Sequence, residues 1–190
     1  MRSLVAVDRG PVPIHTSLLP YLGAFLFTLV PFYHGALRHL DATYVERRGA
    51  HVRAGALLAD FVILFLEGCV FLTLSLLLPY PLYFIWTLAA LLLLDSAWGF
   101  MAHLAFTQHP YTGNSHGRWK PESRWAILNA VTVAALAVYL VGFDMFPPAS
   151  GPGNAKLAIG ALCFTFLRTI LDYAWCWEFY YPSARDEQEA

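Results

Sequence analysis

The chain has 190 residues, of which 58% are hydrophobic and 13% charged, and its mean hydropathy is +0.52. Because soluble domains carry roughly 25% charged residues, this composition excludes an ordinary soluble domain and indicates an integral membrane protein. The formal net charge of −1 excludes the basic field of a nucleic-acid-binding protein, so we expect no nucleic-acid partner.

Five stretches of the chain are apolar and long enough to cross a bilayer, which requires about 20 mostly apolar residues in a helix. In chain order they are residues 17–38, 54–78, 82–106, 124–146 and 155–180, with a short tail at 183–190. The first has room to continue as helix to Val45. Since backbone polar groups in lipid must be satisfied within the segment, we predict an all-α chain. It is expected to form one compact transmembrane bundle of five helices.

Lysine and arginine are unevenly divided between the two sides of this predicted bundle. The loops after the first and third spans, together with the C-terminal tail, hold eight of these residues, and the other side holds three. Positively charged residues favour the cytoplasmic side. We therefore expect a multi-pass protein of the inner (plasma) membrane, with the N-terminus outside and the C-terminus in the cytoplasm. The residues before the first span, interrupted by Asp8, Pro11 and Pro13, are not expected to form a cleavable signal.

Charged and polar residues inside the predicted spans are the unusual feature of the sequence. They are His34 in the first span, Asp60 and Glu67 in the second, Asp95 and His103 in the third, Asn129 and Asp144 in the fourth, and Arg168 and Asp172 in the fifth. One charge at a helix centre costs about 2.5–3.5 kcal/mol on insertion scales. These side chains are therefore expected to face one another, a basic partner or water rather than lipid.

Two copies of the pattern L-D-x-A-W, at residues 94–98 and 171–175, lie on helices that are predicted to run in the same direction. The pattern places Asp95 and Asp172 in equivalent local contexts. It is equally compatible with an old duplication and with a coincidence in a chain rich in leucine and alanine.

The excess of acids over the single deep base, Arg168, indicates a site for protons, a cation or a small solute, open to the cytoplasmic side. In this interpretation Glu67 and Asp95 bind or relay the species, and Arg168 sets their charge state. The candidate site consists of Asp60, Glu67, Asp95, His103, Arg168 and Asp172. The expected surroundings are the lipid bilayer, and a conduction pathway through five helices would require a homo-oligomer.

Two alternatives remain open at this point. The first is an intramembrane enzyme that uses a divalent metal ion, with His34, Glu67, Asp95 and His103 as ligands. His39, Asp41 and Asp60 are further candidate ligands. However, His34 and His39 are five residues apart and so splay by about 140° around a helix, and no HExxH or Glu-x-x-His motif is present. The second is a membrane assembly or lipid-binding subunit in which the ionic cluster is structural. Arg168 would then pair directly with Asp172 and Asp95.

Overall fold

The computed structural model describes residues 18–45, 54–105, 121–142 and 152–181. These ranges contain no strand, so the predicted all-α class is confirmed for the described part of the chain. The helices are α1 (Leu19–Leu40), the π-helical turn η2 (Asp41–Val45), α2 (Ala54–Leu76), α3 (Pro81–Ala105), α4 (Pro121–Gly142), α5 (Pro152–Trp175) and the short α6 (Trp177–Tyr180).

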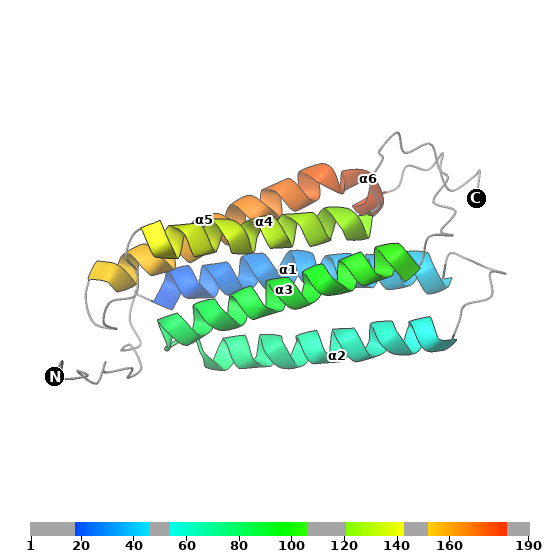
Figure 1. Cartoon of the computed structure of the whole chain (residues 1–190), viewed down its shortest axis with the longest axis horizontal. Coiled ribbons are helices and arrows are strands. Elements are labelled where there is room, and N and C mark those ends of the chain that lie inside the picture. The colour runs from blue at the N-terminus through cyan, green and yellow to red at the C-terminus, as the bar shows by residue number, and fades with distance from the viewer. Residues whose placement is uncertain (1–17, 46–53, 106–120, 143–151, 182–190) are drawn as a thin grey trace.

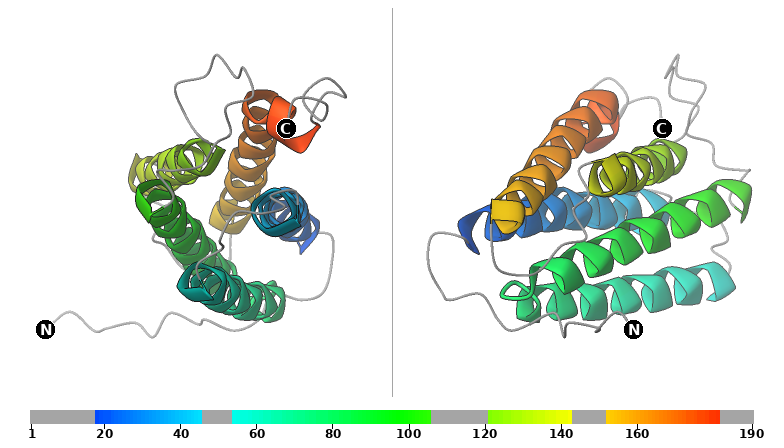
Figure 2. Two further views of the ribbon diagram at one scale, coloured as in Figure 1. Left: turned by 90° about the vertical axis from the view of Figure 1, so that its right-hand side faces the viewer. Right: turned by 60° about the vertical axis from the view of Figure 1, so that its left-hand side comes forward.

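The five long helices form a ring in chain order. Helices α1, α3 and α5 run in one direction, and α2 and α4 run in the other (Figure 1). Seen along its length, each helix lies beside its neighbour in sequence, and α5 closes the ring against α1 (Figure 2). We call the end of the bundle that carries α6 the α6 end, and the opposite end, where α2 turns into α3, the turn end.

In the described part of the chain, four helices are long and apolar enough to cross a membrane. Their apolar windows are Leu57–Leu76, Pro81–Ala102, Pro121–Val141 and Ala155–Trp175. Helix α1 is not among them, because prolines, tyrosines and a histidine dilute its apolar residues. The described chain is therefore consistent with a multi-pass membrane protein. The fifth span and the orientation remain predictions.

Prolines determine where most of the helices begin. Helices α3, α4 and α5 each begin at a proline, and Pro20 lies in the first turn of α1. Proline suits the first helical turn because its missing N–H has no partner within the helix there. Helices α4 and α5 consequently begin three residues before the positions expected from hydropathy alone. The helix predicted over 155–180 is interrupted at Cys176, where φ is −109° and ψ is 17°.

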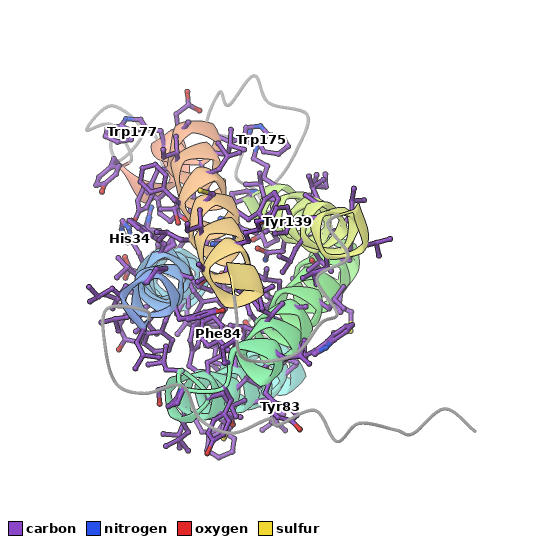
Figure 3. All side chains as sticks on the ribbon, turned by 90° about the vertical axis from the view of Figure 1, so that its left-hand side faces the viewer. His34, Tyr83, Phe84, Tyr139, Trp175 and Trp177 are labelled. Atoms are coloured by element: carbon purple, nitrogen blue, oxygen red, sulfur yellow. The ribbon has the colours of Figure 1, made fainter. Side chains whose placement is uncertain are left out.

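The turn end of the ring is filled by apolar side chains. Phe84 is fully buried, whereas its neighbour Tyr83 is 41% exposed, and Figure 3 shows the first inside the ring and the second at its outer side. The ring of Phe84 packs edge-on against that of Tyr21, with centroids 5.4 Å apart. Large apolar residues on the outer surface, such as Phe61 at 66% and Phe65 at 63% exposure, are suited to lipid contact.

One hydrogen bond fixes α5 against α1 close to the interior ionic residues. Pro31, inside α1, has no N–H to donate to the carbonyl of Phe27 one turn earlier. The Thr169 hydroxyl of α5 lies 2.6 Å from that part-buried carbonyl oxygen and 2.9 Å from the Thr165 carbonyl of its own helix, so its one proton serves both acceptors. Because a carbonyl that lacks a backbone donor needs another one, this contact helps to set how α5 sits on α1. It thereby places the adjacent Arg168.

Candidate functional site: a polar cavity inside the helix ring

A small cavity lies inside the ring, and helices α1 to α6 all contribute to its wall. Its volume is ≈ 20 Å³, measured as the space open to the centre of a water-sized sphere. About 10–15 Å³ on this measure is enough for one water molecule. The polar residues that line it are His39, Glu67, Asp95, Arg168, Asp172 and Tyr180. The cavity therefore has room for a water molecule or a small ion and brings three carboxylates to one guanidinium.

Asn129 of α4 connects Asp95 to Arg168. Its side-chain Nδ2 donates to Asp95 Oδ2, and its Oδ1 accepts a hydrogen bond from Arg168 Nε at 2.5 Å. Asn129 is fully buried. The direct ion pairs that belong to the structural alternative are not seen, since the described residues include none between Arg168 and either Asp95 or Asp172. The Asn129 amide therefore lies between the side chains of Asp95 and Arg168.

Three polar atoms on residues that line the cavity have no hydrogen-bond partner among the described residues. They are Glu67 Oε1, Arg168 Nη1 and Trp125 Nε1, and the first two belong to residues only 1% and 4% exposed. Leaving a buried polar group unpaired costs about 1–3 kcal/mol, and more when it is charged. Glu67 Oε1 is an acceptor, and the two nitrogens are donors. Water is a ligand that can donate to the first and accept from the others.

Asp172 is held by a residue that follows the interruption of α5. The Tyr180 hydroxyl, in α6, lies 3.1 Å from both Asp172 carboxylate oxygens and shares its one proton between them. The Tyr180 ring stacks on His34, with centroids 4.6 Å apart, and His34 Nδ1 is 3.0 Å from the Tyr173 hydroxyl. His34 therefore contacts this aromatic group rather than the carboxylates of the cavity.

Asp60 lies in a second polar cluster, at the α6 end. It accepts hydrogen bonds from Tyr44 at 2.5 Å and from Trp98 Nε1 at 3.1 Å, and His39 Nε2 is 3.4 Å from it. The other imidazole nitrogen, Nδ1, is 3.4 Å from Glu122 Oε1. His39 thus lies between two buried carboxylates, on α2 and α4, and also contributes to the cavity wall.

The structure brings four of the six candidate residues to one cavity, namely Glu67, Asp95, Arg168 and Asp172. Asp60 is buried nearby and is joined to the cavity wall through its hydrogen bonds to neighbouring side chains. The side chain of His103 lies outside the described residues. Asp144 lies outside them as well.

The two L-D-x-A-W segments are equivalent only in part. Both aspartates, Asp95 and Asp172, reach the cavity. Their tryptophans differ, because Trp98 is buried and donates to Asp60, whereas Trp175 is 40% exposed and lies on the outer side of the ring (Figure 3). The repeated pattern therefore predicts where the carboxylates lie and not what the aromatic residues do.

Metal and thiol chemistry receive no support from the described residues. No group of three His, Cys, Asp or Glu side chains among them is arranged to hold a metal ion. Burial, followed by the charge of nearby Asp172, raises the pKa of the Cys176 thiol to about 12. That thiol, just past the apolar window of α5, is therefore protonated and a poor nucleophile.

Sequence reasoning did not assign Asn129, Glu122 or Tyr180 to the site. The sequence feature that could have identified Asn129 is an amide side chain in an otherwise apolar helix. Glu122 lies in the first turn of α4, where acidic residues are common. Tyr180, in α6, resembles the aromatic residues that are common at a membrane interface. Comparison with protein-family models, with curated proteins and with solved structures finds no match for this chain.

Proposed function

We propose that this chain is an integral membrane protein that binds a proton or a small cation in the interior cavity and exchanges it with the aqueous phase at the α6 end. The carrying observation is that Glu67 and Arg168 line the same water-sized cavity, and that each has a polar atom, an acceptor and a donor respectively, without a hydrogen-bond partner among the described residues. Positively charged loops favour the cytoplasm for the α6 end.

The balance of charges supports a positive ligand. The cavity contains three carboxylates, of Glu67, Asp95 and Asp172, and one guanidinium, of Arg168. If all were ionised, the interior would carry an uncompensated negative charge in a low-dielectric environment, which is strongly unfavourable. Bound protons or a bound cation would remove this charge.

A purely structural network explains the cavity less well. In such a network every buried polar atom would have a partner, because a partly satisfied network is worse than an apolar core. Glu67 Oε1 and Arg168 Nη1 do not have one among the described residues. Retaining both unpaired atoms beside a cavity is what a site for an exchangeable ligand requires.

The size of the cavity limits what can bind in this conformation. At ≈ 20 Å³ it admits one water molecule or a small ion, and an organic solute would need a much larger space. A proton or a small cation is therefore favoured over the small solute that the sequence also allowed.

The proposal is tested with protein reconstituted in lipid vesicles that contain a pH-sensitive dye. After an external pH step, or a step in sodium or potassium with a protonophore present, the wild type should speed equilibration relative to protein-free vesicles. Glu67→Gln and Asp95→Asn should return the rate to that of empty vesicles, since each removes an exchangeable carboxyl from the cavity.

The matched controls are Glu178→Gln and Asp41→Asn, which make the same chemical changes at exposed positions on α6 and η2. Both should retain the wild-type rate. Circular dichroism and gel filtration should show that all four variants are folded. Unchanged exchange in Glu67→Gln, or no difference between the wild type and empty vesicles, would contradict the proposal.

A further inference from the structure

We infer that the species held in the cavity is a proton, shared between Glu67 and a water molecule bound by Arg168, and that the site rejects alkali-metal cations. This inference rests on the proposed function and names the substrate class of the same site. It follows from which ligands can form hydrogen bonds with Glu67 Oε1 and Arg168 Nη1.

The free donor of Arg168 is the first constraint. Its Nη1 lacks a hydrogen-bond partner among the described residues, and its Nε is fixed by the Asn129 oxygen at 2.5 Å. An N–H of a guanidinium requires an acceptor, and a guanidinium carries a permanent positive charge. A metal cation in the cavity would offer this N–H no acceptor. A water molecule offers lone pairs.

The arrangement of the carboxylates is the second constraint. A hard cation that sheds its water needs several oxygen ligands around one point. Both oxygens of Asp172 accept from Tyr180, and Oδ2 of Asp95 accepts from Asn129. Moreover, no three acidic, histidine or cysteine side chains in the described ranges converge on a metal position. Among the described residues the cavity therefore offers no set of acidic, histidine or cysteine ligands in place of the hydration shell of a cation.

A proton satisfies the same groups. When a hydronium ion reaches the cavity, one of its O–H bonds breaks as an O–H bond forms at the Glu67 carboxylate, and the remaining water stays in place. That water accepts from Arg168 Nη1 and contacts the Glu67 carboxyl. Release is the reverse step, in which the carboxyl O–H breaks and the proton returns to water. Each step conserves charge and needs no other reactant.

The neighbouring groups determine where the proton can go next. The charged and titratable groups that face the cavity beside Glu67 are His39 from α1, Asp95 from α3, Arg168 and Asp172 from α5, and Tyr180 from α6. Helix α4 contributes the neutral amide of Asn129 through its bond to Asp95. Asp95 accepts from Asn129 through Oδ2, whereas both oxygens of Asp172 accept from Tyr180, which makes Asp95 the chemical counterpart for a proton leaving Glu67.

Infrared spectroscopy of the reconstituted protein tests this inference. A protonated carboxyl has a C=O stretching band that a carboxylate lacks, so a pH titration in choline chloride reports protons held on buried acids. We expect a band that disappears in Glu67→Gln and persists in Glu178→Gln. In Glu67→Asp it should shift. Replacing choline by sodium or potassium at constant pH should leave it unchanged.

The outcomes separate this inference from the function on which it rests. If sodium or potassium removes the band at constant pH, the site binds cations and the inference is overturned, while exchange by Glu67 still stands. If the band is identical in Glu67→Gln and Glu67→Asp, then Glu67 does not hold the proton. Absence of both a titrating band and vesicle exchange would overturn the inference and the proposed function together.

Discussion

The two ends of the helix ring are held together by different interactions. The turn end is packed with apolar side chains, and its fully buried members include Leu74, Phe84, Ile85, Leu88, Leu91 and Leu92. The α6 end is packed with aromatic rings and with polar side chains that bond across helices, including Trp98, Trp125, Phe179 and Tyr180. The cavity is lined by Glu67 and Arg168, each of which has a polar atom without a hydrogen-bond partner among the described residues.

This difference indicates that the two ends of the bundle have different roles, one in stability and one in holding charged groups. Apolar packing at the turn end gains stability without directional constraints. The α6 end depends on hydrogen bonds whose geometry is specific, and these hold charged groups that would be unfavourable in lipid. Variants at the two ends should therefore separate stability from proton exchange.

The largest effect is expected for Arg168→Leu. Removing the guanidinium leaves the Asn129 oxygen without its donor and leaves the acids of the cavity without a positive partner, which is expected to cost about 3–5 kcal/mol. Unfolding in mixed micelles, followed by circular dichroism, measures the loss. Lys156→Leu, which removes an exposed cation from the same helix, should change stability little.

A change at the turn end should lower stability and spare exchange. Leu88 is 1% exposed, so Leu88→Ala is expected to cost about 2–5 kcal/mol through lost burial and a new cavity. The control is Leu93→Ala on the same helix, where the side chain is 52% exposed and the loss should be small. At temperatures where Leu88→Ala is folded, its vesicle exchange should equal that of the wild type. A selective loss of exchange would contradict this difference in roles.

Two glycines test how tightly the α6 end is packed. A methyl group at Gly99 would lie 2.7 Å from the backbone oxygen of Glu122 and 3.1 Å from Ala126 Cβ, whereas nothing lies within 4 Å of one at Gly68. Because a backbone oxygen cannot move aside easily, Gly99→Ala should cost about 1–3 kcal/mol. Gly68→Ala should be neutral or stabilising by up to about 1 kcal/mol. Equal unfolding curves would show that α3 and α4 are not in close contact.

The smallest effect is expected at the contact between α1 and α5. Thr169→Val removes the hydroxyl that bonds the Phe27 carbonyl beside Pro31, at a cost of about 1 kcal/mol. The control is Thr73→Val, which changes an exposed threonine on α2 that bonds only within its own helix. Combining Thr169→Val with Pro31→Ala should recover stability, because the backbone N–H of an alanine can serve the same carbonyl. Additive losses would contradict this account.

The helices were predictable because long apolar runs and prolines are local signals. The convergence of Glu67, Asp95, Arg168 and Asp172 was a reasonable expectation, since charges in apolar helices avoid lipid. Their partners were not predictable. The insertion of Asn129 between opposite charges depends on how α3, α4 and α5 are rotated about their axes, which no local pattern specifies.

The contribution of α6 was hidden for a related reason. Hydropathy continues without interruption through Cys176, so the sequence favours one helix to residue 180. The interruption at Cys176 redirects the chain and carries Tyr180 back to Asp172. Glu122 was missed because its role depends on the approach of His39 from another helix.

The most direct test of the central claim is whether Glu67 meets water or lipid in the bilayer. Solid-state NMR of protein labelled with carboxyl-¹³C glutamate can measure magnetisation transfer from water and from lipid acyl chains, with Glu67→Gln identifying the signal. The account predicts rapid transfer from water to the Glu67 carboxyl carbon and none from acyl chains. Transfer from acyl chains, with no transfer from water, would contradict it.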